Sequence, residues 1–368
     1  MGIRQALGLS AAIAGLAGCS GTSGVNPTAL GQFPGGAAQS SQRQAAGAGR
    51  LDNSLLPPTA TRMFRQPIAG PSFMDVQAAT HPLIFVSDTP DGVVDIYPQA
   101  GKSQKVAGQI TGLNQPQGLA VDAQRNLYVA NTNGSNVLVY APPYSAAPIL
   151  TLNDAGEFPA DVAISTTGVV AVTNICSAPR CRPNTASIAF YAKGGTTPCA
   201  TVSDQAGGVF DLARVYFAGF DASGNLYVDG SDIYNEATFG FIQGGCQATT
   251  VSILGTSPAF SFYLPGSIAV TKSGELAIID LEEHAIGTFV APVTGGSLGN
   301  PLSVTPLTGS LETFTFALLA SGNDVYTTDS GGTGTSGEFA YPTGGAAVNT
   351  IAVGGQPVGV AVSPSYQL

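Results

Sequence analysis

A short phrase that recurs along the chain constrains its fold more than any other feature of the sequence. Each copy contains an apolar strand, a polar turn rich in Gly, Ser or Asn, and a second apolar strand that usually ends in Asp or Asn. The fullest copy is PQGLAVDAQRNLYVAN, residues 116–131. Turns such as residues 221–225, DASGN, supply the Gly and Asn that tight hairpins need for positive φ. Each copy therefore predicts a β-hairpin.

The hairpin recurs at a period of about 40 to 50 residues, and two weaker strand patterns follow each copy. The six copies of its second strand begin at Ile84, Leu127, Val170, Leu226, Leu276 and Val325. A long repeat with four strands and no helix is typical of the blades of a β-propeller. We therefore predict an all-β chain with a six-bladed β-propeller of four-stranded antiparallel blades over residues 80–368.

The two ends of this repeat are incomplete in complementary ways. The first blade lacks its own innermost strand, whereas residues 357–363, PVGVAVS, match such a strand and have no hairpin partner after them. Pairing this C-terminal segment with residues 84–88 would complete the first blade and leave no exposed edge in the ring. The sequence thus predicts ring closure by the C-terminal strand.

The segments PQGLAVD and NLYVAN resemble the repeats of the NHL-repeat propellers and, more loosely, those of the six-bladed SMP-30/gluconolactonase superfamily. The resemblance covers nearly all of residues 80–368. It implies the fold but no single activity, because such propellers include binding scaffolds, lactonases and lyases. In the gluconolactonase-like enzymes one Glu and two Asn or Asp side chains bind the metal. Here they would come from Glu157 or Glu312 with Asn131, Asn174 or Asp280.

The N-terminus carries an export signal. Arg4 precedes a short apolar run that ends in LAGC, residues 16–19, which resembles the lipobox of bacterial lipoproteins. This resemblance implies that residues 1–18 are a removed signal peptide and that Cys19 is acylated. Residues 19–79, rich in Gly, Ala, Ser and Gln, are then a flexible tether. We expect an exported protein, lipid-anchored to the bacterial cell envelope at the outer membrane or cell surface. An ordinary signal peptide with an incidental cysteine is the alternative.

Charge and motifs exclude several functions. A net charge of -10 with only 13 Lys and Arg residues, which are scattered, leaves no electrostatic footprint for nucleic acid. The two histidines, His81 and His284, lie in a lead-in segment and a loop, and neither a Gly-x-Ser-x-Gly elbow nor an HExxH helix is present. The sequence therefore favours a protein that is not an enzyme, although the enzymatic alternative stays open.

Polar residues at the ends of the second strands form a candidate ring, because these ends meet on one rim of a propeller. The rim residues are Asp88, Asn131, Asn174, Asp229, Asp280 and Asp329, joined by Glu157 and Glu312 from the preceding loops. Carboxylate and amide oxygens are ligands for Ca²⁺. The same residues also cap turns by accepting hydrogen bonds from nearby backbone amides. Repetition in nearly every blade favours capping, so no cofactor is required, and Ca²⁺ is the alternative.

Four cysteines follow Cys19, and an even number in an exported domain predicts disulfides. Cys176 and Cys181 bracket a short insertion in the third blade, and Cys199 and Cys246 precede equivalent outer strands of adjacent blades. We expect the pairs Cys176–Cys181 and Cys199–Cys246, with metal binding by the four thiols as a minor alternative.

Two functions of different classes remain. The first is a monomeric, tethered binding or interaction scaffold whose ligand is a protein, a glycan or a small molecule, with membrane contact through the lipid alone. The second is a metal-dependent hydrolase or lactonase of the gluconolactonase type. The sequence favours the first.

Overall fold

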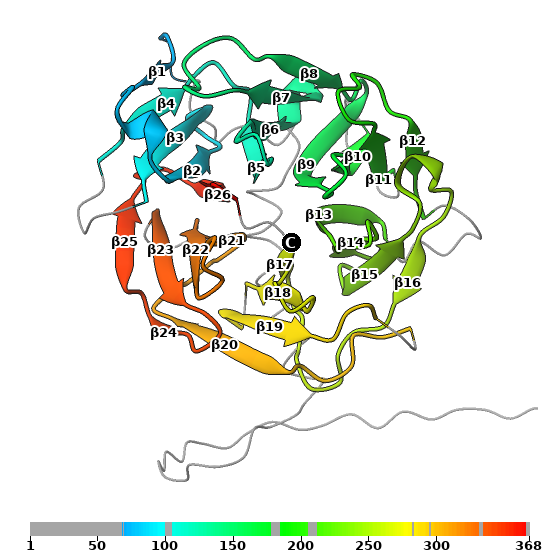
Figure 1. Ribbon diagram of the computed structural model, residues 1–368. Helices are drawn as coiled ribbons and strands as arrows, with labels where there is room; N and C mark the ends of the chain where they lie inside the picture. Colours follow the sequence, from blue (N-terminus) through cyan, green and yellow to red (C-terminus); the bar gives the residue numbers. More distant parts are fainter. Residues whose placement is uncertain are drawn as a thin grey trace, which may run out of the picture.

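The computed structural model describes residues 68, 70–99, 105–177, 185–204, 212–281, 283–293, 296–330 and 334–365. In these residues, six sheets stand around a central axis (Figure 1), and their strands pair antiparallel except for one short parallel pair at an outer edge. Four sheets have four strands, and two carry a fifth. The chain is an all-β, six-bladed β-propeller, as the repeat predicted. Within the described part of the chain no helix has the length and apolar character needed to cross a membrane.

Each blade runs outward from an inner strand beside the axis, and blades are numbered here by the order of their second strands. The inner strands of blades 1 to 6 are β26 (Pro357–Ser363), β5 (Pro116–Val121), β9 (Glu157–Ile164), β13 (Arg214–Phe220), β17 (Pro265–Val270) and β21 (Phe316–Leu318). The second strands are β2 (Leu83–Asp88), β6 (Leu127–Asn131), β10 (Val170–Ser177), β14 (Leu226–Ser231), β18 (Leu276–Asp280) and β22 (Asp324–Asp329).

The outer half of each blade contains the two strands that follow the hairpin. The third strands are β3 (Val93–Pro98), β7 (Asn136–Tyr140), β11 (Ser187–Tyr191), β15 (Ala237–Ile242), β19 (Ala285–Phe289) and β23 (Thr335–Ala340). The fourth strands are β4 (Gly108–Ile110), β8 (Leu150–Asn153), β12 (Ala200–Val202), β16 (Ser252–Leu254), β20 (Ser303–Thr308) and β25 (Asn349–Ala352). The extra strands are β1 (Phe73–Met74) and β24 (Gly345–Ala346), and the 3-10 helices are η2 (Ala78–Thr80), η3 (Thr132–Gly134) and η4 (Gly245–Gln247).

Polar turns set the register of the inner hairpins. In blade 2, Asp122 Oδ1 accepts hydrogen bonds from the backbone N–H groups of Gln124 and Asn126 at 2.9 and 2.7 Å. Asp221 makes the corresponding bonds in blade 4, where Gly224 has a φ of 81°. These bonds satisfy turn amides that the ladder leaves free, which is why the phrase carries Asp and Gly between its two strands.

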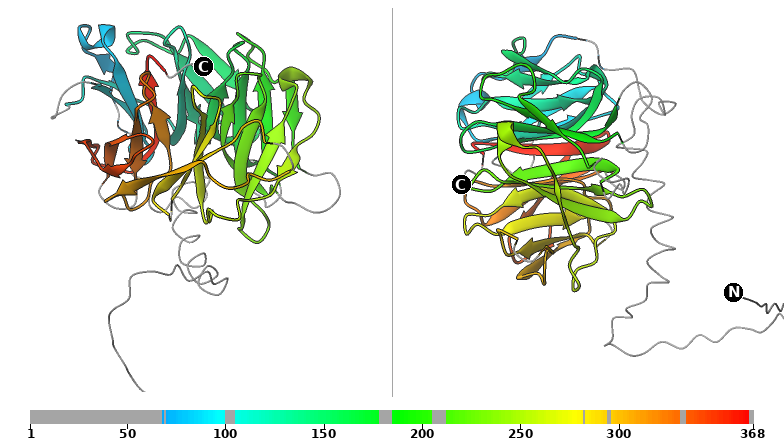
Figure 2. Two further views of the ribbon diagram at one scale, coloured as in Figure 1. Left: turned by 60° about the horizontal axis from the view of Figure 1, so that its bottom comes forward. Right: turned by 90° about the vertical axis from the view of Figure 1, so that its right-hand side faces the viewer.

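The ring closes as expected through β26, which pairs antiparallel with β2 from Leu83↔Ser363 to Asp88↔Pro357. Figure 2 shows β26, in red, within the disc seen edge-on. Ser87 Oγ accepts the N–H of Gly359 at 2.7 Å and donates to the carbonyl of Gln117 in the next blade, also at 2.7 Å. A Cβ at Gly359 would meet this same carbonyl. Blade 1 is thus built from both ends of the domain and joined tightly to blade 2.

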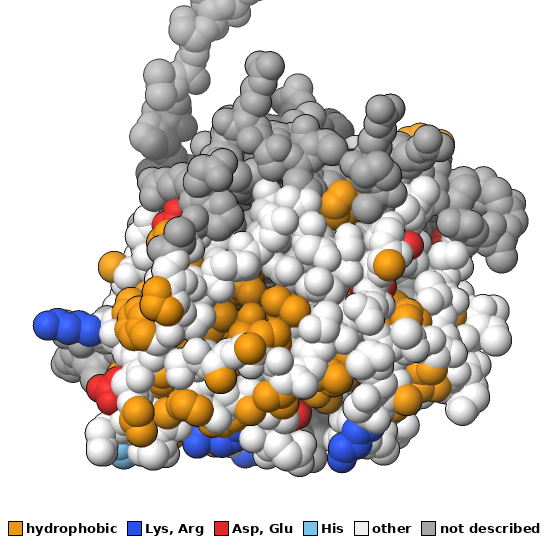
Figure 3. Space-filling view, turned by 90° about the horizontal axis from the view of Figure 1, so that it is seen from above, with side chains coloured by type: hydrophobic (Ala, Val, Ile, Leu, Met, Phe, Trp, Pro, Cys, Tyr) orange, Lys and Arg blue, Asp and Glu red, His pale blue; other side chains and the backbone are white. Residues whose placement is uncertain are grey.

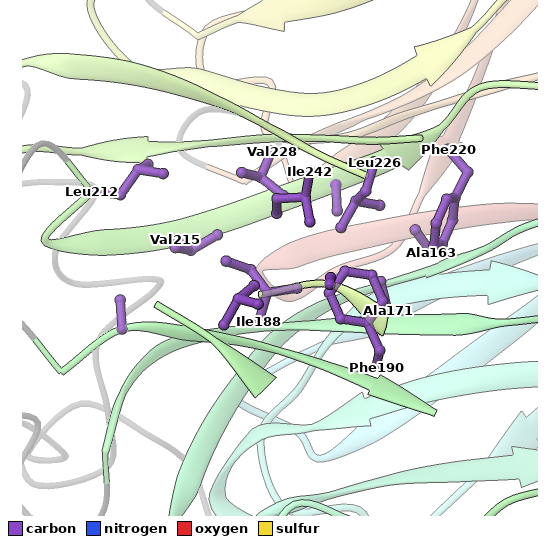
Figure 4. Packing of buried hydrophobic residues seen from close by; sticks show 14 residues of the cluster. Ala163, Ala171, Ile188, Phe190, Leu212, Val215, Phe220, Leu226, Val228 and Ile242 are labelled. Atoms are coloured by element: carbon purple, nitrogen blue, oxygen red, sulfur yellow. The ribbon is translucent and has the colours of Figure 1, made fainter. Parts of the chain in front are cut away.

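The hydrophobic core lies between neighbouring blades, because both faces of each sheet are covered. Figure 4 shows one such layer, in which Ile188 and Phe190 of blade 3 face Val215, Leu226 and Ile242 of blade 4. All five side chains are almost inaccessible to solvent. Burial on both faces explains why the inner strands read as continuous apolar runs rather than as an alternation of apolar and polar residues.

A disulfide between Cys199 and Cys246 joins the outer parts of blades 3 and 4, with a Cα–Cα distance of 5.2 Å. This pairing confirms the sequence prediction. Cys176 is disulfide-bonded, while its predicted partner Cys181 lies outside the described residues.

Some residues before the predicted domain boundary at residue 80 belong to the sheet of blade 1. Phe73 and Met74 in β1 pair with Gln109 and Gly108 at the outer edge of blade 1. Residues 19–67 and 69 of the expected tether, with Cys19, and the signal peptide lie outside the described residues. Figure 3 views one edge of the disc and shows hydrophobic side chains gathered in the middle of that edge.

Candidate functional site

A cavity of about 400 Å³ occupies the centre of the ring. Apolar side chains from the ends of all six inner strands surround it, namely Val121, Ile164, Phe220, Val270, Leu318 and Val362. The lining also includes residues of the turns between first and second strands, such as Gln124, Ser165 and Asp221. The cavity therefore lies on the turn face of the disc, which is the opposite face from the predicted rim.

The other end of the ring is filled. Phe158 of blade 3, Phe217 of blade 4, Phe314 next to blade 6 and Val358 of blade 1 belong to one buried cluster. These residues come from opposite sides of the ring and stand at or near the beginning of its inner strands, so they meet across the axis. The cluster separates the rim face from the cavity, and any ligand of the cavity must approach from the turn face.

Asp161 is the carboxylate nearest the inner end of the cavity. It stands in the middle of β9, lines the cavity and is only 7% exposed. Its Oδ2 accepts the N–H of Ala218 in the next blade at 3.2 Å. On its other side is Gly118 of blade 2, where a Cβ would meet the Asp161 carboxylate and backbone. Glycine at position 118 thus makes room for this carboxylate between three blades.

Burial dominates the electrostatics of Asp161. It raises the pKa of the carboxyl from 3.8 to about 7, although hydrogen bonds from the backbone of Val162 and Ala218 lower it. The carboxyl therefore changes charge near neutral pH. Asp122 and Asp221 also line the cavity, but their oxygens bind their own turns at its mouth. Asp161 is the deep charge that a ligand would meet.

The predicted rim residues are held mainly by the backbone of their own blades. Asp280 Oδ2 accepts the N–H groups of Tyr263 and Leu264 at 2.9 and 3.0 Å, and Asp329 accepts those of Leu311 and Glu312. The same arrangement links Asn131 to Asn114 at 2.6 Å, Asp229 to Phe217 at 3.0 Å and Asp88 to Gln356 at 3.4 Å. In every case the donor belongs to the inner strand or to the segment leading into it.

These side chains therefore perform the local capping role in each blade. Among the described residues, no three His, Cys, Asp or Glu side chains are grouped as they would be around a metal ion. Burial raises the pKa of the Asp229 carboxyl well above its usual range, and the charges of Asp161 and Asp280 raise it further.

Blade 3 departs from this pattern. Asn174 donates through Nδ2 to Ser187 Oγ at 3.2 Å, and Glu157 Oε1 accepts the hydroxyl of Ser177 at 3.5 Å. Asp154, in the turn before β9, is buried beside them. Sequence analysis included Glu157 and Asn174 but not Asp154.

Two functional candidates were thus missed from the sequence. Asp161 could have been found by aligning PADVAI, residues 159–164, with PQGLAV, residues 116–121, because a carboxylate then stands where blade 2 has Gly118. Asp154 could have been found from its spacing of three residues before Glu157, which is the spacing of a tight turn.

Comparisons with known proteins agree with the fold. Residues 113–140, which include the first hairpin of blade 2, match the family model of the NHL repeat. No curated protein sequence matches the chain significantly. A chain in the crystal structure of the nidogen/laminin complex is similar with a TM-score of 0.56 and 15% identity, covering 77% of this chain and 98% of that chain.

A protein of unknown function from Bacteroides caccae has a TM-score of 0.55 and 11% identity, over 77% of this chain and 98% of its own. A protein from Lactobacillus plantarum has a TM-score of 0.52 and 14% identity, over 76% and 84%. Identities this low show a shared fold and nothing about activity. The chain is a six-bladed β-propeller that contains an NHL repeat.

Proposed function

We propose that this protein is a binding protein whose central cavity takes a small molecule or chain end with an apolar body and one ammonium group. The buried carboxylate of Asp161 at the inner end of the cavity is the observation that carries this proposal; the other charged residues of the lining are Asp122, Asp221 and Lys193. The apolar part of the walls provides affinity through burial of the ligand, and the deep carboxylate of Asp161 provides orientation. A volume of about 400 Å³ suits a small ligand.

Binding is favoured over catalysis by what surrounds Asp161. No His, Cys or Glu is among the described residues that line the cavity, and the other two acids of the lining, Asp122 and Asp221, accept hydrogen bonds from their own turns. On the opposite face, Asp280, one of the carboxylates that a gluconolactonase-type metal site would use, accepts backbone hydrogen bonds in its own blade. These observations support a scaffold role rather than a hydrolase.

The affinity of the cavity for an ammonium probe should depend on pH through Asp161. With a pKa of about 7, this carboxyl is mostly ionised at pH 8 and mostly neutral at pH 6. We expect hexylammonium, which stays charged over this range, to bind about tenfold more weakly at pH 6 than at pH 8. Nuclear magnetic resonance titration of the purified domain measures this change.

Two variants and one neutral probe control the experiment. Asp161→Asn should bind hexylammonium weakly at both pH values, whereas Asp229→Asn, which replaces a buried carboxyl that does not line the cavity, should keep the pH dependence. Hexanol should bind with little pH dependence. Equal hexylammonium affinity in the Asp161→Asn protein and the unchanged protein would contradict the proposed role.

We propose that the propeller works at the cell envelope, held by a lipid on Cys19. The lipobox-like residues 16–19 support this location. Replacing Cys19 by Ala should move the protein from the membrane fraction to the soluble fraction of the producing bacterium, because acylation needs the thiol. Ser20→Ala is the matched control and should stay with the membranes. Retention of the Cys19→Ala protein in washed membranes would contradict the anchor.

A further inference from the structure

Three buried side-chain oxygens in blade 3 accept no hydrogen bond from any described residue. They are Asp154 Oδ2, Glu157 Oε2 and Asn174 Oδ1. Asp154 is 3% exposed and Asn174 is fully buried. A buried polar atom without a partner costs free energy of about 1 to 3 kcal/mol, and more when it is charged. Three such oxygens in one blade indicate that a partner is missing from the described residues.

The three side chains belong to one small part of blade 3. Asp154 and Glu157 are joined by a turn in which the N–H of Glu157 donates to the carbonyl of Asp154 at 3.1 Å. Asn174 and Ser177 in β10 pair with Pro159 and Glu157 in β9, respectively. The turn therefore stands against the rim end of β10.

Electrostatic effects also connect these side chains. A hydrogen bond with the side chain of Asn174 lowers the pKa of Asp154, and the charge of Asp154 raises that of Glu157. Burial is the largest effect on both carboxyls and raises both pKa values, to about 6 and about 7. Among the described residues, the other effects on Asp154 and Glu157 are hydrogen bonds from the Tyr191 and Ser177 hydroxyls, and no described positive side chain compensates the two carboxyls.

The chemistry of the open atoms selects the missing partner. Two carboxylate oxygens and one amide oxygen are hard ligands, which suit Ca²⁺, whereas Zn²⁺ prefers nitrogen and sulfur. Ser187 holds the Asn174 amide through a hydroxyl that can donate or accept, so either end of that amide can face Asp154. Ca²⁺ also tolerates irregular coordination better than Mg²⁺, which demands a near-ideal octahedron.

We propose that Asp154, Glu157 and Asn174 bind one Ca²⁺ ion within blade 3. The ion ties the turn before β9 to β10 and has a structural role. None of these residues lines the central cavity, so the proposal is independent of the ligand site at Asp161. It also differs from a ring of rim residues, because the other blades use their Asp and Asn side chains as caps.

Calcium alone is the probe for the first test. Protein stripped with a chelator should bind one Ca²⁺ per chain in a calorimetric titration. Its melting temperature should rise by about 5 °C or more when the free Ca²⁺ concentration is about a hundred times the Kd. Mg²⁺ at the same concentration should give a much smaller shift. An unchanged melting temperature at 5 mM Ca²⁺, about the upper range for extracellular modules, would overturn the proposal. An equal response to Mg²⁺ would overturn the assignment to Ca²⁺.

A spectroscopic test works on the unaltered protein. Tyr191 donates its hydroxyl to Asp154 Oδ1 at 3.2 Å, so Tb³⁺ in the calcium position would lie beside a tyrosine ring. Excitation of tyrosine should then sensitise Tb³⁺ emission, and Ca²⁺ should quench it by competition. Absence of this emission in stripped protein would count against the site, and emission that survives in Tyr191→Phe would show that Tb³⁺ binds elsewhere.

Conservative variants locate the ion. Asp154→Asn and Glu157→Gln keep the shape of each side chain and should each weaken Ca²⁺ binding at least tenfold. Asp161→Asn removes a different buried carboxylate of the same blade and should leave Ca²⁺ binding unchanged while it alters binding in the cavity. Calcium affinity that survives in both Asp154→Asn and Glu157→Gln would overturn the assignment.

Discussion

Deleting β26 should abolish the folded propeller. A chain that ends at Gln356 lacks the inner strand of blade 1, in which all seven residues are buried. Burial of Val358, Val360 and Val362 alone contributes about 5 to 9 kcal/mol, which is comparable with the whole stability of an ordinary domain. We therefore expect no cooperative thermal transition in circular dichroism and rapid digestion by proteases. A chain that ends at Ser365 is the matched control and should melt normally.

Two further experiments test whether the missing strand β26, rather than the shorter chain length, causes the loss of stability. Gly359→Val keeps β26 but introduces a side chain that meets the Gln117 carbonyl of the next blade, so it should also destabilise the ring strongly. A synthetic peptide of residues 357–365 added to the truncated chain should restore part of the protection against proteases. If the truncated chain keeps the melting temperature of the control, the closure described here does not stabilise the fold.

The propeller should be more stable in mild acid than at slightly alkaline pH. Burial is the largest effect on Asp88, Asp161 and Asp280, and it raises their pKa values to about 6, 7 and 7 from 3.8. Between about pH 4 and 7 the folded state therefore holds protons that the unfolded state has released. The resulting stability is complete below the unfolded pKa values and is lost as pH rises through the folded ones.

The change in stability with pH should be large because several buried carboxyls contribute to it. Each pKa unit corresponds to about 1.4 kcal/mol, and we expect the free energy of unfolding to be about 2 to 4 kcal/mol greater at pH 5 than at pH 8. Urea denaturation at several pH values, with a chelator present, measures this difference. In the Asp161→Asn protein, the difference in the free energy of unfolding between pH 5 and pH 8 should be smaller by about a third. A stability that rises between pH 5 and 8 would contradict the dominant effect of burial on these carboxyls.

The fold could be predicted because its determinants are local and repeated. Each hairpin contains the residues that its turn requires, such as Asp122 in blade 2 and Gly224 in blade 4. The six copies of the hairpin then predict six blades. The closure was predictable because residues 357–363 match an inner strand that lacks its hairpin. The pair Cys199–Cys246 was predictable from equivalent positions in adjacent blades.

The site depends on which residues meet between blades, and the repeat does not specify this. Asp161 is close to Gly118 and Ala218, which belong to the two neighbouring inner strands. The sequence analysis placed a candidate site at the rim because Asp or Asn recurs there in nearly every blade. This recurrence reflects a structural requirement, since these side chains accept hydrogen bonds from the backbone of their own blades. The cavity lies on the other face because bulky residues such as Phe217 and Phe314 meet across the axis and fill the rim end of the channel.

The pairing of β26 with β2 also determines the order in which this chain can fold. As synthesis or export proceeds from the N-terminus, the residues of blades 2 to 6 are all released before the partner of Leu83 appears at Ser363. Blade 1 is therefore the last to be completed, and its second strand waits with an open edge that can pair with another chain. A chaperone that covers this edge until β26 is available would then raise the yield of folded protein.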